Sequence, residues 1–182
     1  VNGTHTYPSN FMFVAAMNPC PCGYYPGPKC RCTDYEIIKY RGKISGPIMD
    51  RIDIQKSVHP VDFFGINEKE PAMSSEQIRK RVEGARKIQQ ERYADEEGIN
   101  CNAQMSTSLI QKYCVLDKPS LELLRVVSEE FGYSARVIHK LLRLARTSAD
   151  LDASENIRLE DVQAVLSCRD LDQSNSKMMV VK

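Results

Sequence analysis

Several features that would assign this sequence to a familiar class are missing. No apolar run approaches the roughly 18 residues of a membrane span, and no signal peptide opens the chain. We therefore expect a cytoplasmic protein without membrane contact, whose seven cysteines are reduced or metal-bound rather than paired in disulfides. The formal net charge of +1 gives no chain-wide attraction for nucleic acid, although it is compatible with a local basic patch.

Two further absences concern catalysis and the start of the chain. The phosphate-binding pattern Gly-x4-Gly-Lys-Ser/Thr does not occur, so this segment alone is not expected to bind ATP tightly or hydrolyse it. No Ser/His/Asp or Cys/His pattern indicates a nucleophilic site. The chain begins with Val1 instead of Met, within a turn-like Val-Asn-Gly-Thr sequence. We expect an excised piece of a longer protein.

The first third of the chain has mixed α/β character. The short apolar run Phe11–Met17 predicts a buried, parallel strand, and the imperfect alternation of Ile52–Val58 predicts a half-buried one. Between them, a capping box at Thr33 and Glu36 predicts a helix through Tyr40. A second short helix is expected to begin at Ser45-Gly46-Pro47.

The rest of the chain is predicted to be helical. Apolar residues at helical spacing and capping signals predict five helices, at 75–93, 107–113, 117–132, 134–151 and 159–168. The fold class is therefore an α/β remnant followed by an all-α bundle. We divide the chain into the C-terminal part of an α/β core (1–60, with a Cys-rich insert at 18–33), a linker (61–73), a helical domain (74–169) and a flexible tail (170–182).

Four cysteines form the strongest local motif. Cys20-x-Cys22 and Cys30-x-Cys32 are separated by seven residues, and four thiolates from two close pairs suit a tetrahedral zinc ion. A metal would also order a segment that has few large aliphatic residues. The Cys-x-Cys spacing is tighter than the usual Cys-x2-Cys, however, so four reduced structural cysteines remain the alternative. Of the other cysteines, Cys114 and Cys168 are expected to be small core residues.

Three polar residues are candidates for contact with a phosphate group. Asn18 follows the predicted strand at the edge where α/β sheets bind ligands. Arg51 lies between a short helix and a strand, from which it could stabilise charge on a neighbour's phosphate. Arg136 falls in the first turn of a long helix, where anions are favoured. Taken singly, each is better explained as a turn former or a solvated side chain.

The sequence around the cysteines is basic and aromatic. Such a mixture suits a DNA backbone, but it also suits an ordinary solvated surface. The residues concerned are Lys29, Arg31, Lys39, Arg41, Lys43, Tyr24 and Tyr25.

Three segments, in order, resemble the magnesium-chelatase-like AAA+ ATPases, and most closely their ComM subgroup. They are Phe13-Val-Ala-Ala-Met-Asn-Pro-Cys-Pro-Cys-Gly23, Ile44-Ser-Gly-Pro-Ile-Met-Asp-Arg-Ile-Asp53 and Tyr133-Ser-Ala-Arg-Val-Ile-His-Lys-Leu-Leu-Arg-Leu-Ala-Arg-Thr-Ser-Ala-Asp-Leu151. The resemblance covers about residues 1 to 168. It implies that the helical domain is the lid of an AAA+ module, with the tail end of the α/β core before it.

The resemblance also implies roles for the three polar residues. Asn18 is similar to sensor 1, which positions the attacking water, and Arg51 to the arginine finger offered to the next subunit's ATP. Arg136 is similar to sensor 2, which reaches from the lid to the nucleotide. The resemblance further implies ATP and Mg²⁺ as cofactors, a hexameric ring of identical subunits, and phosphate- and magnesium-binding residues upstream of this chain.

Three functions stay open at this point. The longer protein is expected to be a DNA motor that drives branch migration, as the ComM resemblance implies. The alternative is a chelatase-like or protein-remodelling ATPase that acts on a protein partner. The isolated segment, without its phosphate loop, is expected to behave as a metal-stabilised helical binding module without catalysis.

Overall fold

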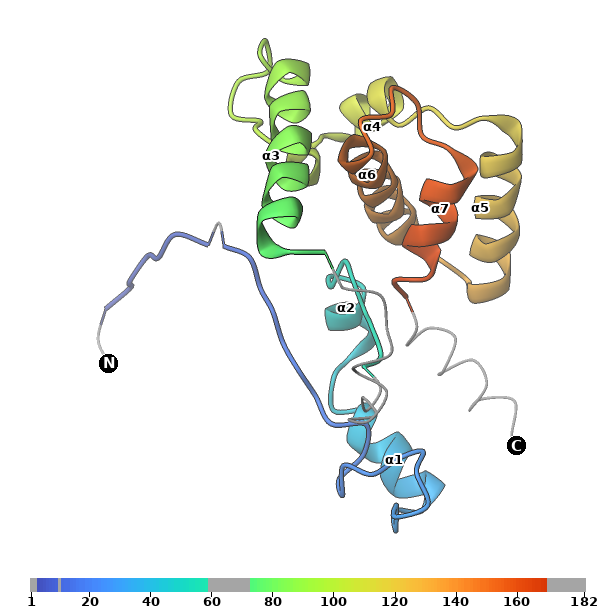
Figure 1. Cartoon of the computed structure of the whole chain (residues 1–182). Helices are drawn as coiled ribbons and strands as arrows, with labels where there is room; N and C mark the ends of the chain where they lie inside the picture. Colours follow the sequence, from blue (N-terminus) through green and yellow to red (C-terminus); the bar gives the residue numbers. More distant parts are fainter. Residues whose placement is uncertain (1–2, 10, 59–72, 170–182) are drawn as a thin grey trace. The chain divides into compact units, whose positions relative to one another are not determined.

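The computed structural model describes residues 3–9, 11–58 and 73–169, which form seven α-helices, α1 to α7, one 3-10 helix, η2, and no strand (Figure 1). The chain divides into two compact units, Val1–Met49 and Asp50–Lys182. The predicted linker at 61–73 lies, except for Met73, outside the described residues, as does the predicted tail at 170–182. No described helix has both the length and the apolar character that a membrane crossing requires.

The first unit is built from turns and two short helices, α1 (Asp34–Arg41) and α2 (Gly46–Met49). Both helices were predicted. Thr33 caps α1 with the expected capping box: its hydroxyl accepts from the Glu36 amide, and the Glu36 carboxylate accepts from the Thr33 amide. Among the described residues of this unit only Cys20 and Ile37 are buried. An apolar core this small cannot stabilise a fold by itself.

The predicted buried strand at Phe11–Met17 is not formed in this structure. The segment is extended but has no bridge to any described residue, and its large side chains are exposed; Met12 is 88% exposed. A strand becomes buried only when neighbouring strands accept its ladder hydrogen bonds and another layer covers its faces. The described residues supply neither, so the apolar pattern has no partner here.

The second predicted strand, Ile52–Val58, is reduced to a single parallel bridge between Gln55 and Arg169. The Gln55 amide donates to the Cys168 carbonyl at 2.7 Å. Gln55 is buried, whereas Ile54 is 55% exposed. The expected apolar alternation therefore does not decide which side chains face inward, because among the described residues the segment forms one bridge and no longer ladder.

The second unit is a bundle of five α-helices and η2 (Asn102–Gln104), close to the prediction. The helices are α3 (Ser75–Arg92), α4 (Thr107–Tyr113), α5 (Lys118–Phe131), α6 (Ala135–Leu151) and α7 (Leu159–Leu166). Side-chain caps begin four of them: the Ser74, Ser106, Asp117 and Ser134 oxygens each accept an amide hydrogen bond of the first turn. Gly132 ends α5 in the left-handed conformation, with φ of 63°.

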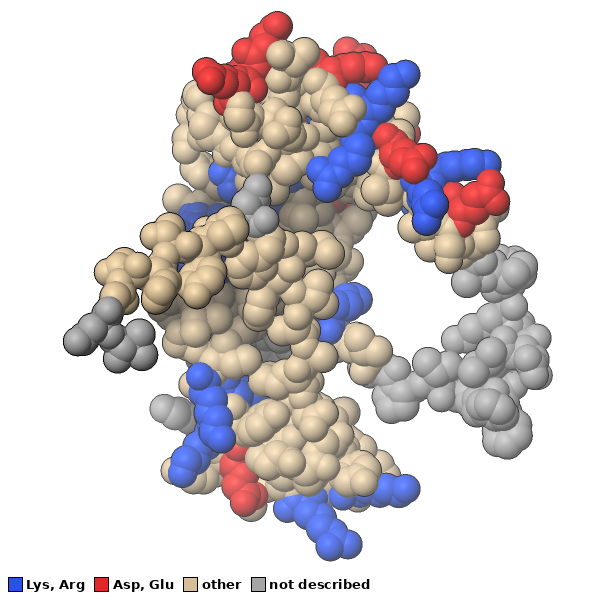
Figure 2. All heavy atoms as spheres, turned by 90° about the vertical axis from the view of Figure 1, so that its left-hand side faces the viewer, with Lys and Arg blue, Asp and Glu red and all other residues tan. Residues whose placement is uncertain are grey.

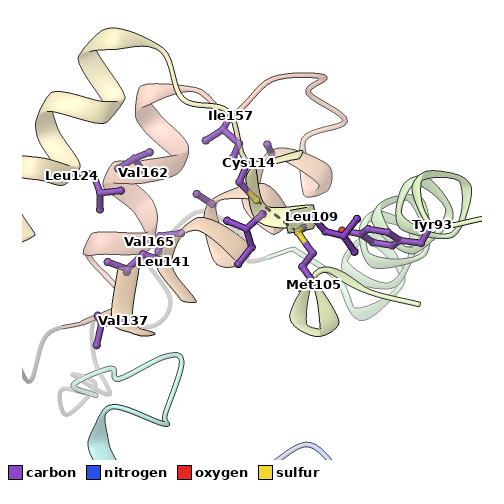
Figure 3. Packing of buried hydrophobic residues seen from close by; sticks show 13 residues of the cluster. Tyr93, Met105, Leu109, Cys114, Leu124, Val137, Leu141, Ile157, Val162 and Val165 are labelled. Carbon is purple, nitrogen blue, oxygen red and sulfur yellow. Dashed lines mark hydrogen bonds between the residues drawn. The ribbon is translucent and has the colours of Figure 1, made fainter. Parts of the chain in front are cut away.

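The core of the bundle is organised around α6, which contacts α3, α4, η2 and α7. Leu141 and Ala145 lie on its buried face, as predicted, and pack in one cluster with Leu124 of α5 and Val162 and Val165 of α7 (Figure 3). Cys114 joins this cluster as the expected small core residue. Most other elements of the bundle therefore contact α6.

Some predicted core positions are on the surface instead. Ile78 and Val82 of α3 are exposed, as is Leu121 of α5, and Cys168 is only half-buried. Among the described residues α3 packs mainly against α6, and its buried positions are Ala85 and Gln89, toward its C-terminal end. Helical spacing selects a face, but the neighbouring elements decide how much of that face is covered.

Candidate functional site

The four predicted metal-ligating cysteines are brought together in the first unit. All four Sγ atoms lie within 4.8 Å of one another. The Sγ of Cys20 is 3.3 Å from that of Cys22 and 3.8 Å from that of Cys30, and the Cys22 and Cys30 sulfurs are 3.6 Å apart. A tetrahedron with metal–sulfur bonds of about 2.3 Å has sulfur–sulfur edges of about 3.8 Å. The thiols are therefore spaced as ligands of one ion.

Tight turns hold the cysteines in this arrangement. The amide of Gly23 donates to the Cys20 carbonyl at 3.1 Å, and the amide of Cys30 donates to the Gly27 carbonyl at 3.0 Å. Gly23 adopts φ of 83°, a conformation that favours glycine. We call residues 20–32, with their four cysteines, the cysteine knuckle. Arg41 connects α1 to it, because Nε of Arg41 donates to the carbonyl of Pro19, the residue before the knuckle, at 3.1 Å.

The environment of the thiols favours thiolate in part of the cluster. Backbone amides of Tyr24 and Arg31 donate to Cys22 and lower its pKa to about 6. Cys32 accepts a backbone hydrogen bond from Cys22, which lowers its pKa, but burial and the neighbouring sulfurs outweigh this and raise it to about 12. Four thiols this close cannot all ionise without a cation between them. The donor set therefore fits a soft divalent ion such as Zn²⁺.

A basic surface surrounds the cysteine cluster. Residues 1–49 contain five Lys or Arg and two acidic residues, Asp34 and Glu36, whereas the whole chain carries a net charge of only +1. In Figure 2 basic side chains project around the lower part of the view, where α1 lies in Figure 1. Tyr24 and Tyr35 are exposed beside them. The Arg41 guanidinium lies 5.2 Å from the centroid of the Tyr25 ring.

Asn18 lies in the first unit, where the extended segment turns into the cysteine knuckle. Its side chain is exposed. The amide is next to Gly23, since a Cβ at Gly23 would lie 3.8 Å from Asn18 Nδ2. The predicted position at the end of an extended segment is therefore observed, but the expected sheet edge around it is not formed by the described residues.

Arg136 is the second residue of α6 and is exposed. Ser134 caps this helix by accepting from the Val137 amide at 3.4 Å. The other first-turn amides and the helix dipole leave a partial positive charge at this end. Arg136 adds a full positive charge to the same end of α6, and whether this end binds an anion stays a prediction.

Arg51 is exposed and lies in the turn that follows α2. The structure connects this turn to the helix of Arg136: Lys140 of α6 donates to the Arg51 carbonyl, and its Nζ lies 2.9 Å from Oδ1 of Asp53. Sequence patterns had not singled out Lys140 or Asp53. The signal that could have identified Lys140 is its spacing from Arg136: the two residues are four positions apart and therefore lie on one face of the helix.

Two sequence families match the chain. The family described as "Magnesium chelatase, subunit ChlI C-terminal" matches residues 72–169, and "Magnesium chelatase, subunit ChlI" matches residues 1–64. The chain belongs to the magnesium-chelatase-like family of AAA+ ATPases, as the resemblance implied.

Curated relatives support the same family. The chain is 35% identical over 170 residues to the uncharacterized protein YifB of Salmonella typhimurium, covering 92% of this chain and 32% of YifB. It is 32% identical over 157 residues to the competence protein ComM of Haemophilus influenzae, covering 86% of this chain and 30% of ComM. An uncharacterized protein of Mycobacterium bovis is 31% identical over 168 residues, 92% of this chain and 33% of that protein. The chain thus spans about a third of the length of these relatives.

Proposed function

We propose that this chain is part of an AAA+ ATPase that couples ATP hydrolysis to the remodelling of DNA, in the manner of a branch-migration motor. Residues 1–60 would be the C-terminal part of the α/β core, completed by strands outside this chain, and residues 74–169 the lid. The family matches over 1–64 and 72–169 support this division of labour. ATP and Mg²⁺ would be held with residues outside this chain, because no phosphate loop occurs within it. The isolated chain is expected to be inactive.

The observation that carries this proposal is the placement of Arg136 on α6. An exposed guanidinium in the first turn of a packed helix adds to the field that already favours a phosphate there. In phosphoryl transfer the protein acts mainly by positioning and by stabilising charge on the phosphoryl oxygens. We assign Arg136 to sensor 2, Asn18 to sensor 1 and Arg51 to the arginine finger.

Arg51 would act on the nucleotide of a neighbouring subunit. A lone protomer then lacks one of the cations that stabilise the transition state, and removal of such an arginine costs on the order of 10³-fold or more in turnover. Assembly into a ring, which we propose to be a hexamer, would switch hydrolysis on. Arg136 would couple the nucleotide state to the angle of the lid.

DNA is the substrate that the charge distribution favours. The excess of basic over acidic residues within 1–49, with exposed tyrosines among them, offers contacts to phosphates and to stacked bases. The rest of the chain has no such excess, since the whole carries only +1. A protein substrate, the alternative reading, would require a different recognition surface.

We further propose that Cys20, Cys22, Cys30 and Cys32 hold one structural Zn²⁺. The sulfur spacing supports this, and so does the small core of the first unit, which needs an additional source of stability. The ion would fix the knuckle that follows Asn18 and carries the basic surface. It would have no part in ATP hydrolysis.

The test is ATP hydrolysis by the complete protein, measured with and without branched or single-stranded DNA, in the wild type and in Arg51→Ala. We expect DNA to stimulate the wild type, and Arg51→Ala to lose turnover while it still binds nucleotide. Hydrolysis that is indifferent to DNA would replace DNA with a protein substrate. A fully active Arg51→Ala protein would remove Arg51 from the site.

A further inference from the structure

A lysine of α6 bonds the segment that carries Arg51. Lys140, in the second turn of that helix, donates from Nζ to the Arg51 carbonyl and forms an ion pair with Asp53 at 2.9 Å. The Lys140 side chain is only 14% exposed, whereas that of Asp53 is 60% exposed. The ammonium is therefore held against the segment, where it satisfies a main-chain oxygen and a carboxylate two residues apart.

The far end of the same segment is attached to the end of α7. The amide of Gln55 donates to the Cys168 carbonyl at 2.7 Å, and Nζ of Lys56 donates to the Ser167 carbonyl at 3.0 Å. Residues 51–56 are thus bonded at one end to α6 and at the other to the two residues that directly follow α7. These two helices pack on each other through the core of the bundle.

Lys140 and Arg136 lie four residues apart on α6, on the same face of the helix. A rigid helix transmits a rotation at its first turn to its second turn without loss. When a contact at Arg136 moves α6, the Lys140 ammonium, which donates to the Arg51 carbonyl, therefore moves with the helix. Both bonds to the segment are made by the Lys140 ammonium.

We propose that Lys140 is a positioning residue for Arg51, and that it makes the placement of Arg51 depend on the orientation of α6. The proposal rests on the roles assigned to Arg51 and Arg136 above. The nucleotide state sensed at Arg136 in one subunit would then set the position of the arginine that the same subunit offers to its neighbour. Lys140 itself touches no substrate.

The fastening can be tested on this chain without any nucleotide. In Lys140→Met the stem stays and the ammonium is lost, so the Gln55 amide should exchange its hydrogen about tenfold faster. Lys80→Met is the matched control, because Lys80 pairs with Glu76 on the exposed side of α3, and its Gln55 exchange should equal that of the wild type. Lys140→Arg should restore slow exchange, which would separate this effect from misfolding. Unchanged exchange in Lys140→Met overturns the proposal.

The coupling is tested in the complete protein by steady-state ATP hydrolysis. If Lys140 acts through Arg51, Lys140→Met should lower kcat at least tenfold with the KM for ATP unchanged, and Lys140→Arg should recover most of it. A kcat equal to that of the wild type, beside an inactive Arg51→Ala protein, overturns the positioning role alone. A fully active Arg51→Ala protein overturns the arginine-finger assignment and the coupling with it, while hydrogen exchange would still report the contact.

Discussion

Asp150 and Arg92 form a buried ion pair that joins α6 to α3. Nη1 of Arg92 lies 2.8 Å from Oδ2 of Asp150, whose side chain has no exposed surface. The same carboxylate accepts from the side-chain amide of Asn102 (Nδ2) at 2.8 Å and from that of Gln89 (Nε2) at 3.2 Å. Nε of Arg146 donates to its Oδ1 at 3.1 Å. One carboxylate therefore holds together α3, η2 and α6.

Replacing Asp150 should destabilise the helical unit strongly. In Asp150→Asn the buried Arg146 and the partly buried Arg92 lose their shared anion, which costs about 3–5 kcal/mol. Urea unfolding followed by circular dichroism should show this loss in the free energy of unfolding. Glu122→Gln is the control, because Glu122 and Arg125 form an exposed pair worth at most about 1 kcal/mol. Equal losses in the two variants would contradict the structural role of Asp150.

The stability of this unit should fall in acid. Burial alone would raise the pKa of Asp150, but hydrogen bonds from Arg92 and Asn102 outweigh it, and the pKa lies below its ordinary value. A carboxyl group whose pKa is lowered by folding stabilises the protein at pH values above its unfolded pKa of about 4. This stabilisation is lost as the pH falls through the pKa of the group in the folded protein.

The urea midpoint should therefore be nearly constant between about pH 7 and pH 5 and should decrease below about pH 4. Asp161 acts in the same direction. Burial alone would raise its pKa, but hydrogen bonds from Arg158 outweigh burial, and the pKa lies below its ordinary value. The decrease should be shallower in Asp150→Asn, which has one fewer group to protonate. An equally steep decrease in that variant would assign the acid sensitivity to other carboxyl groups.

Two glycines should respond to alanine with opposite signs. Gly132 has φ of 63° at the end of α5, so Gly132→Ala should lower the free energy of unfolding by about 1 kcal/mol. Gly84 lies inside α3 with open space around a Cβ, so Gly84→Ala should raise it by about 0.5–1 kcal/mol. Thermal unfolding of the two variants measures both effects, and a stabilised Gly132→Ala would contradict the left-handed cap.

The cysteine cluster predicts one tightly bound zinc ion per chain. Native mass spectrometry should show one ion in the wild type and in Cys101→Ser, whose cysteine lies outside the cluster. Cys30→Ser should lose it, because three thiolates do not complete the tetrahedron. Acidification should release zinc with a steep pH dependence, since protons compete for the sulfurs. A metal-free wild type would remove zinc from the proposal.

Local sequence signals predicted most of the helices. Thr33 with Glu36, Asp117 and Ser134 begin helices where expected, because a cap is a hydrogen bond between a side chain and an amide three residues away. Gly132 ends one for an equally local reason. The grouping of Cys20, Cys22, Cys30 and Cys32 was also predicted, since only short turns separate them. Interactions of this range require no knowledge of distant residues.

Burial and long-range pairing could not be predicted in this way. The run Phe11–Met17 has the composition of a buried strand but has no neighbour among the described residues. Ile78, Val82 and Leu121 occupy apolar helix positions that no described element covers. An apolar pattern states which surface should be covered, but the covering element is supplied by another part of the protein.

The sequence by itself determined the α-helices, the cysteine motif and the family. Only the tertiary structure decided that Asp150 pairs with both Arg92 of α3 and Arg146 of α6. It also decided that Lys140 donates to the backbone carbonyl of Arg51. The physical reason is distance along the chain. Caps and turns are formed by residues a few positions apart. The Arg92–Asp150 ion pair spans 58 positions and the Lys140 hydrogen bond to the Arg51 carbonyl spans 89, so both exist only after the core around α6 has packed.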